Sequence, residues 1–170
     1  IVDIIDNFLP DYDFQRIKDL CLGNNFPYYF QQHVASQYMD EQEGKAESLD
    51  NYFFNHTLYV YDKPTSDYYN ILEEVFKPKL QWRSLVRIKV NLYPRTDKIY
   101  HQAKHVDWDY ENLKGALFFI NTNNGFTSMP DGTKVESVEN RMVLFDPTKE
   151  HFGTSCTDQK VRCNINFNYF

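Results

Sequence analysis

The chain has 170 residues, 42% of them hydrophobic and 17% aromatic, which is enough for one sizeable core and too little for two ordinary domains. The many Tyr and Phe residues favour sheets and wide hydrophobic contacts over a helical bundle. A net charge of −6 disfavours a nucleic-acid partner, and no apolar run reaches the length of a membrane span.

Two amphipathic helices are predicted in the N-terminal half of the chain. The first covers residues 11–22, where apolar side chains recur near helical spacing and Gly23 ends the pattern. The second covers residues 66–77, with apolar residues at i, i+3, i+4, i+7 and i+8 and Pro78 beyond them. The first helix is expected to pack on a sheet, which an aromatic strand at residues 52–61 extends.

Two polar segments interrupt this half. Residues 31–51 are polar and acidic, which predicts a mobile loop that closes over substrate or, equally, a surface excursion without function. The basic stretch from Lys77 to Lys89 alternates with apolar residues and is interpreted as a solvated strand face. Further along, Pro130-Asp131-Gly132 predicts a hairpin tip near a functional site.

Two later segments alternate as strands do. In residues 85–93 and 161–169, apolar side chains occupy one face and polar side chains the other. An alternative is that the polar faces are simply the wet side of an antiparallel sheet. The favoured interpretation is one polar pocket, lined from the two strands by Asn91, Tyr93, Arg162 and Asn164.

A candidate metal site follows from His105-Val106-Asp107 and His151. His105 and Asp107 are two residues apart, so on a strand both point to the same face, whereas His151 must come from another strand. Two imidazoles and one carboxylate on one face of Fe(II) leave open positions for a chelating cosubstrate and dioxygen. Arg162 adds a planar, charged fork suited to gripping a carboxylate.

The motifs form a longer series in the C-terminal half, and together they resemble one known family. They are Tyr93-Pro94, Tyr100, His105-Val106-Asp107, Gly115 to Asn121, Gly125-Phe126, Asn140 to Asp146, His151 and Arg162 to Ile165. From about Leu85 to Phe170 the chain resembles the 2-oxoglutarate and Fe(II)-dependent dioxygenases of the prolyl 4-hydroxylase type.

The resemblance implies a fold and a domain organisation. The fold would be mainly β with flanking helices (α+β), built on a double-stranded β-helix (jelly-roll, cupin-like) core. Residues 1–170 would form a single dioxygenase domain, with residues 1–84 as supporting helices and strands and residues 85–170 as the catalytic core.

The resemblance also implies roles for individual residues. His105, Asp107 and His151 would be iron ligands, and Arg162 would hold the distal carboxylate of 2-oxoglutarate, with a hydrogen bond from Tyr93. The implied reaction decarboxylates 2-oxoglutarate to succinate and CO2 and hydroxylates an unactivated C–H with O2, with ascorbate as a candidate reductant. The expected substrate is a peptide or small molecule, most plainly a prolyl or other amino-acid side chain. The remaining cofactor-binding candidates are Asn91 and Asn164.

Two departures from the family pattern affect the cosubstrate pocket. A second tyrosine is usual after the His-x-Asp, where this chain has Phe118-Phe119, so one polar contact would be lost. The usual Gly-Gly pair is Asn124-Gly125 here. Neither departure removes chemistry.

Three alternatives stay open. AlkB-type nucleic-acid demethylases share Asn91-x-Tyr93 and Arg162-x-Asn164, but their second arginine corresponds to Asn168 here. A jelly-roll binding module retaining a relic metal site would be non-catalytic. A cupin-like metalloenzyme that uses the same ligands without 2-oxoglutarate would leave Arg162 without a task.

The remaining cysteines and histidines are assigned structural places. An odd number of cysteines without metal spacing, Cys21, Cys156 and Cys163, indicates free buried thiols and a reducing, cytoplasmic location. No secretory signal is recognised. Three further histidines are expected not to bind metal, namely His33, His56 and His101.

Overall fold

The computed structural model describes residues 2–34 and 49–170. In chain order the first elements are β1 (Asp3–Ile5), α1 (Asp11–Leu22), β2 (Tyr29–Gln31), β3 (Phe53–Val60), β4 (Lys63–Pro64) and α3 (Tyr69–Leu80). They are followed by β5 (Leu85–Pro94), β6 (Lys114–Phe119), β7 (Phe126–Ser128), β8 (Lys134–Glu136), β9 (Arg141–Phe145), β10 (Phe152–Gly153) and β11 (Val161–Tyr169).

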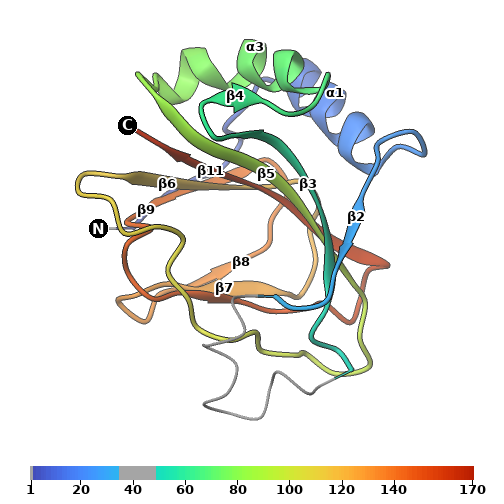
Figure 1. Ribbon diagram of the computed structural model, residues 1–170. Helices are drawn as coiled ribbons and strands as arrows, with labels where there is room; N and C mark the ends of the chain where they lie inside the picture. Colours follow the sequence, from blue (N-terminus) through green and yellow to red (C-terminus); the bar gives the residue numbers. More distant parts are fainter. Residues whose placement is uncertain (1, 35–48) are drawn as a thin grey trace.

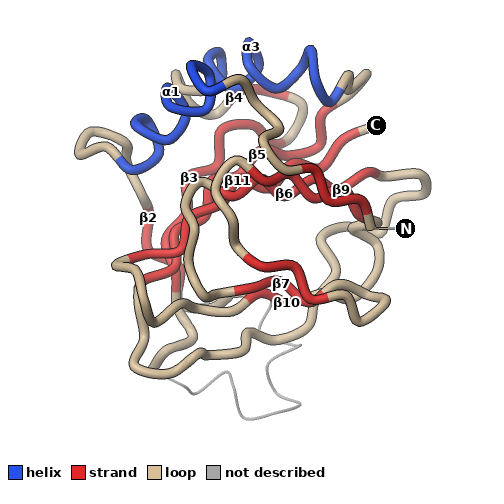
Figure 2. The backbone as a smooth tube through the Cα atoms, turned by 180° about the vertical axis from the view of Figure 1, so that it is seen from behind, coloured by secondary structure: helices blue, strands red, loops and turns tan. Residues whose placement is uncertain are grey.

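Two antiparallel sheets face each other (Figure 1). The larger has the order β1-β9-β6-β11-β5-β3-β2, with β4 paired to β3, and the smaller has the order β10-β7-β8. Helices α1 and α3 cover the outer face of the larger sheet, and the smaller sheet lies across from its inner face (Figures 1 and 2). The predicted mainly β, jelly-roll architecture with flanking helices is confirmed.

The main hydrophobic core lies between the two helices and the larger sheet. Alternation along β6 separates this core from a second one, because Phe118 packs against Phe76 and Phe14 under the helices. Its neighbours Leu117 and Phe119 belong instead to the cluster on the inner side of the sheet. Each buried Phe contributes about 1.5–3 kcal/mol of hydrophobic stabilisation, so both faces of this sheet are held by packing.

The first predicted helix is confirmed with the expected bounds, and the second is displaced. Helix α3 begins at Tyr69 and continues through Pro78 to Leu80, whereas the sequence pattern predicted residues 66–77. Pro78 lies in the last turn, where its missing N–H removes a single helical hydrogen bond. The helix then ends at Gln81 in the left-handed conformation, and the Gln81 N–H donates to the Lys77 carbonyl at 2.8 Å.

The polar faces of the two alternating strands are buried, so the wet-sheet alternative is wrong. Strand β11 lies between β5 and β6 in the middle of the larger sheet. Asn91, Asn164 and Asn166 are 4%, 2% and 6% exposed. The β5–β11 register pairs the polar residues in four successive rungs: Tyr93 with Arg162, Asn91 with Asn164, Lys89 with Asn166 and Arg87 with Asn168.

Other sequence predictions have mixed outcomes. The hairpin turn at Pro130-Asp131-Gly132 is present between β7 and β8, with Gly132 at a φ of 84° and its N–H bonded to the Met129 carbonyl. The three cysteines are free and buried. In the described part of the chain no helix is long and apolar enough to cross a membrane. Most of the predicted lid, residues 35–48, lies outside the described residues.

The predicted division of the chain at residue 84 stays a prediction. Strands β2 and β3, from the first half, extend the same sheet as β5 and β11. The two halves are therefore joined by continuous backbone hydrogen bonding.

Candidate metal centre

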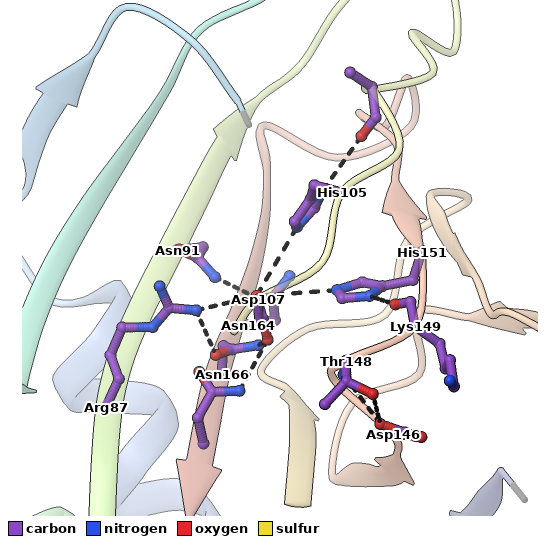
Figure 3. A network of polar contacts seen from close by, with 12 residues as sticks. Arg87, Asn91, His105, Asp107, Asp146, Thr148, Lys149, His151, Asn164 and Asn166 are labelled. Atoms are coloured by element: carbon purple, nitrogen blue, oxygen red, sulfur yellow. Dashed lines mark hydrogen bonds and ion pairs between the residues drawn. The ribbon is translucent and has the colours of Figure 1, made fainter. Parts of the chain in front are cut away.

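Three side chains from two segments of the chain, His105 and Asp107 from one and His151 from the other, converge between the two sheets (Figure 3). His105 and His151 form an isolated antiparallel bridge, with backbone hydrogen bonds of 3.0 and 2.9 Å between them. The Asp107 N–H donates to the Pro147 carbonyl at 2.9 Å, which ties the backbone at Asp107 to the segment that leads to His151. The Nε2 atoms of His105 and His151 lie 3.9 and 4.0 Å from Asp107 Oδ1, and the ligand atoms all lie within 4.8 Å of one another.

Backbone carbonyls orient both imidazoles. His105 Nδ1 lies 3.2 Å from the Ala103 carbonyl oxygen, and His151 Nδ1 lies 3.0 Å from that of Lys149. A carbonyl can only accept, so each Nδ1 carries the hydrogen and each Nε2 directs a lone pair at the centre. Burial, aided by the neighbouring His151, lowers the pKa of His105 to about 4, which keeps its ring neutral at neutral pH.

Asp107 is held as a carboxylate by three donors. Its Oδ2 accepts from the amides of Asn166 and Asn168 at 3.0 and 2.9 Å, and its Oδ1 accepts from Arg87 Nη2 at 3.0 Å. Burial alone would raise the pKa of Asp107, but the Arg87 charge and the other contacts hold it well below its ordinary value. The side chain is 6% exposed.

The sequence analysis missed these three partners of Asp107. Arg87, Asn166 and Asn168 belong to the polar faces of β5 and β11 that were recognised as alternating. The available sequence signal was that the alternating polar residues of β11 continue beyond Asn164 to Asn166 and Asn168. The basic stretch from Lys77 to Lys89 is therefore not a solvated face at its C-terminal end, because Arg87 and Lys89 point between the sheets.

The donor set fits a ferrous ion. Two neutral imidazole nitrogens and one carboxylate oxygen, facing a shared space, are the ligand types of a facial triad with open positions. The space itself has a volume of about 50 Å3, room for roughly four water molecules. Its walls include the three ligands, Arg162, Tyr93, Asn91, Asn164, Asn166, Lys89 and Gln102.

Arg162 lies in the wall of the same cavity and is almost completely buried, at 1% exposure. Its guanidinium donates to Ser137 Oγ at 2.8 Å, to Thr127 Oγ1 at 2.8 Å and to the Thr154 carbonyl at 3.3 Å. These acceptors are all neutral, and no carboxylate of the described residues forms an ion pair with Arg162. A buried cation without a counter-ion is costly unless a ligand supplies the negative charge.

A glycine makes room for the arginine. A Cβ atom on Gly125 would lie 2.7 Å from Arg162 Cδ and 2.6 Å from the Ser155 carbonyl oxygen. Both distances are shorter than van der Waals contact, and the second involves backbone. Gly125, which the sequence pattern singled out, is therefore required by the position of Arg162.

Tyr93, Asn91 and Asn164 complete the polar wall. The Tyr93 ring lies 5.5 Å from the Arg162 guanidinium and stacks on Phe53 at 5.4 Å. Burial raises the pKa of Tyr93 to about 12, so its hydroxyl stays a donor. The Asn91 amide donates to Asn164 Oδ1 at 3.0 Å, and Asn91 Oδ1 is buried without a hydrogen-bond partner.

The remaining predictions about the site concern residues elsewhere in the fold. His33, His56 and His101 lie outside the group formed by His105, Asp107 and His151; His56 packs among Phe26, Tyr29 and Tyr68, and His101 stacks on Phe152. The hairpin tip at residues 130–132 is not among the residues lining the metal cavity, and its predicted proximity to the metal stays a prediction. Strand β7 contributes Thr127 instead.

Comparison with known proteins identifies the fold. No family model matches the sequence, and no curated protein matches it. A prolyl-4-hydroxylase from Pseudomonas putida aligns with a TM-score of 0.56 and 13% identity over 99% of this chain and 91% of that chain. An oxidoreductase of the 2OG-Fe(II) oxygenase family from Burkholderia pseudomallei aligns at 0.66 and 12% over 99% and 84%.

A third similar structure carries a ligand. It is a prolyl hydroxylase from Trichoplax adhaerens in complex with a hypoxia inducible factor oxygen degradation domain peptide fragment, with a TM-score of 0.63 and 12% identity over 99% of this chain and 83% of that chain. At such identities the likeness establishes a shared fold.

Proposed function

We propose that this chain is an Fe(II)- and 2-oxoglutarate-dependent dioxygenase that hydroxylates an unactivated C–H bond in a peptidyl or amino-acid substrate, with a prolyl residue as the first candidate. The observation that carries the proposal is the convergence of His105, Asp107 and His151, each oriented by its own hydrogen bonds. The fold shared with prolyl hydroxylases supports the reaction class.

The three ligands would hold the ion on one side and leave the cavity side free. When bound, the metal and the cosubstrate supply the oxidising chemistry, in which 2-oxoglutarate becomes succinate and CO2 and one oxygen atom of O2 enters the substrate. The protein contributes orientation: Asn166 and Asn168 hold one Asp107 oxygen, so the other faces the two imidazoles. The His105 and His151 rings are fixed by the carbonyl bonds described above.

Arg162 is assigned the distal carboxylate of 2-oxoglutarate. Its guanidinium is buried, charged and bonded only to neutral acceptors, so a carboxylate would supply the missing counter-charge. Tyr93, on the same rung, is assigned an additional hydrogen bond. The Asn91–Asn164 rung lies between Arg162 and the rung that carries Asn166, and would flank the carbon chain of the cosubstrate.

Excluding water is the second contribution of the protein. Leu117 and Phe145 line the cavity beside the triad, and the Phe145 ring lies 4.9 Å from that of His151. A dry wall of this kind strengthens the electrostatic contacts of Asp107 and Arg162. Ascorbate as a reductant and a cytoplasmic location stay predictions.

The proposal is tested with anaerobic protein loaded with Fe(II). Adding 2-oxoglutarate should produce a visible charge-transfer band, and admitting O2 should yield succinate; a relic binding module would give neither. Asp107→Ala should abolish both, whereas Asp109→Ala, which removes an exposed carboxylate two residues away, should retain them. Wild-type succinate formation by Asp107→Ala would refute the ligand assignment.

Arg162→Met tests the cosubstrate assignment separately. Losing a bidentate charged contact should weaken 2-oxoglutarate binding by roughly 2 to 4 kcal/mol, about 30-fold to 1,000-fold, with metal affinity mostly kept. Unchanged 2-oxoglutarate affinity would contradict the role of Arg162. Proline-containing peptides are then screened for a mass increase of one oxygen atom.

A further inference from the structure

A second cation in the metal cavity has no role in the chemistry described so far. Lys89 lies on β5 opposite Asn166, one rung beyond Asn91 as seen from Arg162. Its side chain lines the metal cavity and also an open groove of about 720 Å3 that leads to the surface. Arg162 lines only the first of these two spaces, so the two cations face different approaches to the metal.

Lys89 has no negative partner among the described residues. No hydrogen bond or ion pair of its ammonium group is present there, and the ammonium lies over the Phe53 ring at 5.6 Å. Asp107 attracts the ammonium group without forming an ion pair with it, and its two oxygens already accept from Arg87, Asn166 and Asn168. Burial, reinforced by the Arg87 charge, lowers the pKa of Lys89 to about 7. The Lys89 ammonium group is therefore buried without an ion-pair partner to compensate its charge.

The balance of charge around the metal points to an anionic ligand. Three cations, Arg87, Lys89 and Arg162, and one carboxylate, Asp107, lie in or against the cavity in the described part of the chain. A ferrous ion and the dianion of 2-oxoglutarate cancel each other, so the loaded site would keep an excess of positive charge. Because cavities of low dielectric strengthen such fields, a negatively charged third component would be attracted.

The position of Lys89 places this excess positive charge on the side of the cavity that faces the groove, away from the proposed cosubstrate. The Asn91–Asn164 rung lies between Arg162 and Lys89 in the sheet, and this rung and Arg162 are the residues assigned to the cosubstrate. Lys89 instead is shared by the walls of the metal cavity and of the groove, whose walls also include Tyr29, Tyr61 and Trp108. A molecule that reaches the metal through the groove therefore meets the ammonium group on its way.

We propose that Lys89 binds a carboxylate of the prime substrate, so that the oxidised molecule carries an acidic group close to the reacting carbon. The carboxylate would belong either to a small free acid or to an Asp or Glu side chain of a peptide. This inference rests on the proposed function, because it assumes that Arg162 takes the cosubstrate.

The first experiment uses acetate and its neutral analogue acetamide as probes. Protein is loaded with Mn(II), which does not turn over, and saturated with 2-oxoglutarate; the paramagnetic relaxation of the probe methyl protons then reports their proximity to the metal. Acetate should relax at least about tenfold more than acetamide in the wild type and in Lys104→Met, which removes an exposed lysine. Lys89→Met and Lys89→Gln should abolish the difference, and Lys89→Arg should preserve it.

Three results would overturn the inference. The first is equal relaxation of acetate and acetamide in the wild type. The second is an acetate effect that persists in Lys89→Met, which would show binding to the metal itself. The third is a tenfold loss of 2-oxoglutarate affinity in Lys89→Met, which would place the lysine in the cosubstrate site. Failure of 2-oxoglutarate to bind the wild type would instead count against the proposed function.

The second experiment identifies the source of the carboxylate. Succinate formation is measured with pools of free carboxylic acids and their amides, and with Asp- or Glu-containing peptides matched to Asn and Gln versions. Stimulation by the acids alone supports a small free substrate, and stimulation by the acidic peptides supports a peptidyl one. Equal stimulation by the neutral partners contradicts the inference, and where no pool stimulates turnover the acetate experiment decides.

Discussion

The ion pair between Arg87 and Asp107 offers a quantitative test of the electrostatics of the centre. Arg87 Nη2 donates to Asp107 Oδ1 at 3.0 Å, and the two side chains are 16% and 6% exposed. The same oxygen faces both imidazoles. In the metal-free protein Arg87 therefore supplies part of the positive charge that a metal ion would provide. Removing Arg87 should therefore harm the metal-free protein more than the metal-bound one.

The size of the effect depends on which donors remain on Asp107 when Arg87 is removed. Breaking a buried ion pair by removing one partner costs about 3–5 kcal/mol, and the two amide donors that remain on Asp107 favour the lower end. The contact of Arg87 with the Trp108 ring, at 5.6 Å, adds only about 0.5–1 kcal/mol. Arg87→Met should therefore lose about 3.5–4 kcal/mol without metal, which corresponds to a fall in melting temperature of roughly 7–16 °C.

Urea unfolding with and without saturating Mn(II) measures the stability of the metal-bound and of the metal-free protein. Metal should stabilise Arg87→Met by about 1.5 kcal/mol more than the wild type, because the ion replaces the missing charge. In an Asp107→Asn background the cost of Arg87→Met should fall below about 1 kcal/mol. An equal cost in both backgrounds would mean that the loss comes from packing and would refute the electrostatic reasoning.

Two further changes, a substitution at Gly125 and a change of pH, test the packing and the protonation of the site. Gly125→Ala places a methyl group 2.7 Å from Arg162 Cδ and 2.6 Å from the Ser155 carbonyl oxygen, so it should lower 2-oxoglutarate affinity at least about tenfold and stability by about 1–3 kcal/mol; cosubstrate titration with wild-type affinity would contradict this. Acidification should destabilise the metal-free protein, because the folded pKa of His105 is about 4 and the unfolded chain takes up that proton from about pH 6.5 downward. The loss should reach about 2 kcal/mol at pH 5, and a His105→Asn variant with an unchanged pH slope in urea unfolding would count against it.

Much of the polar wall could be predicted from alternation alone. The patterns of residues 85–93 and 161–169 place Asn91, Tyr93 and Arg162 with Asn164 on shared strand faces, and the structure has them there. What alternation could not reveal is which face water reaches. That depends on the sheet β10-β7-β8, whose strands of two or three residues are too short to leave a pattern. For this reason Arg87 and Lys89 were interpreted as solvated.

The partners of Asp107 required a different kind of information. Spacing was sufficient to group His105 and Asp107 with His151, but the amides that hold the carboxylate come from β11 through its register with the rest of the sheet. A register shift of one residue would send those amides to the opposite face, and no local pattern determines the register. The predicted end of helix α3 was wrong for a simpler reason, because a helix tolerates a proline in its last turn.

The central place of β11 divides the metal centre into two parts with different opening rates. Asn166 and Asn168 sit on a fully paired strand, so their backbone amides should exchange with deuterium only when the whole domain unfolds. The His105–His151 bridge is a single isolated pair, and its amides should exchange through small local openings. An ion would then leave by way of the histidines, while the amides of Asn166 and Asn168 that hold the Asp107 carboxylate keep their positions.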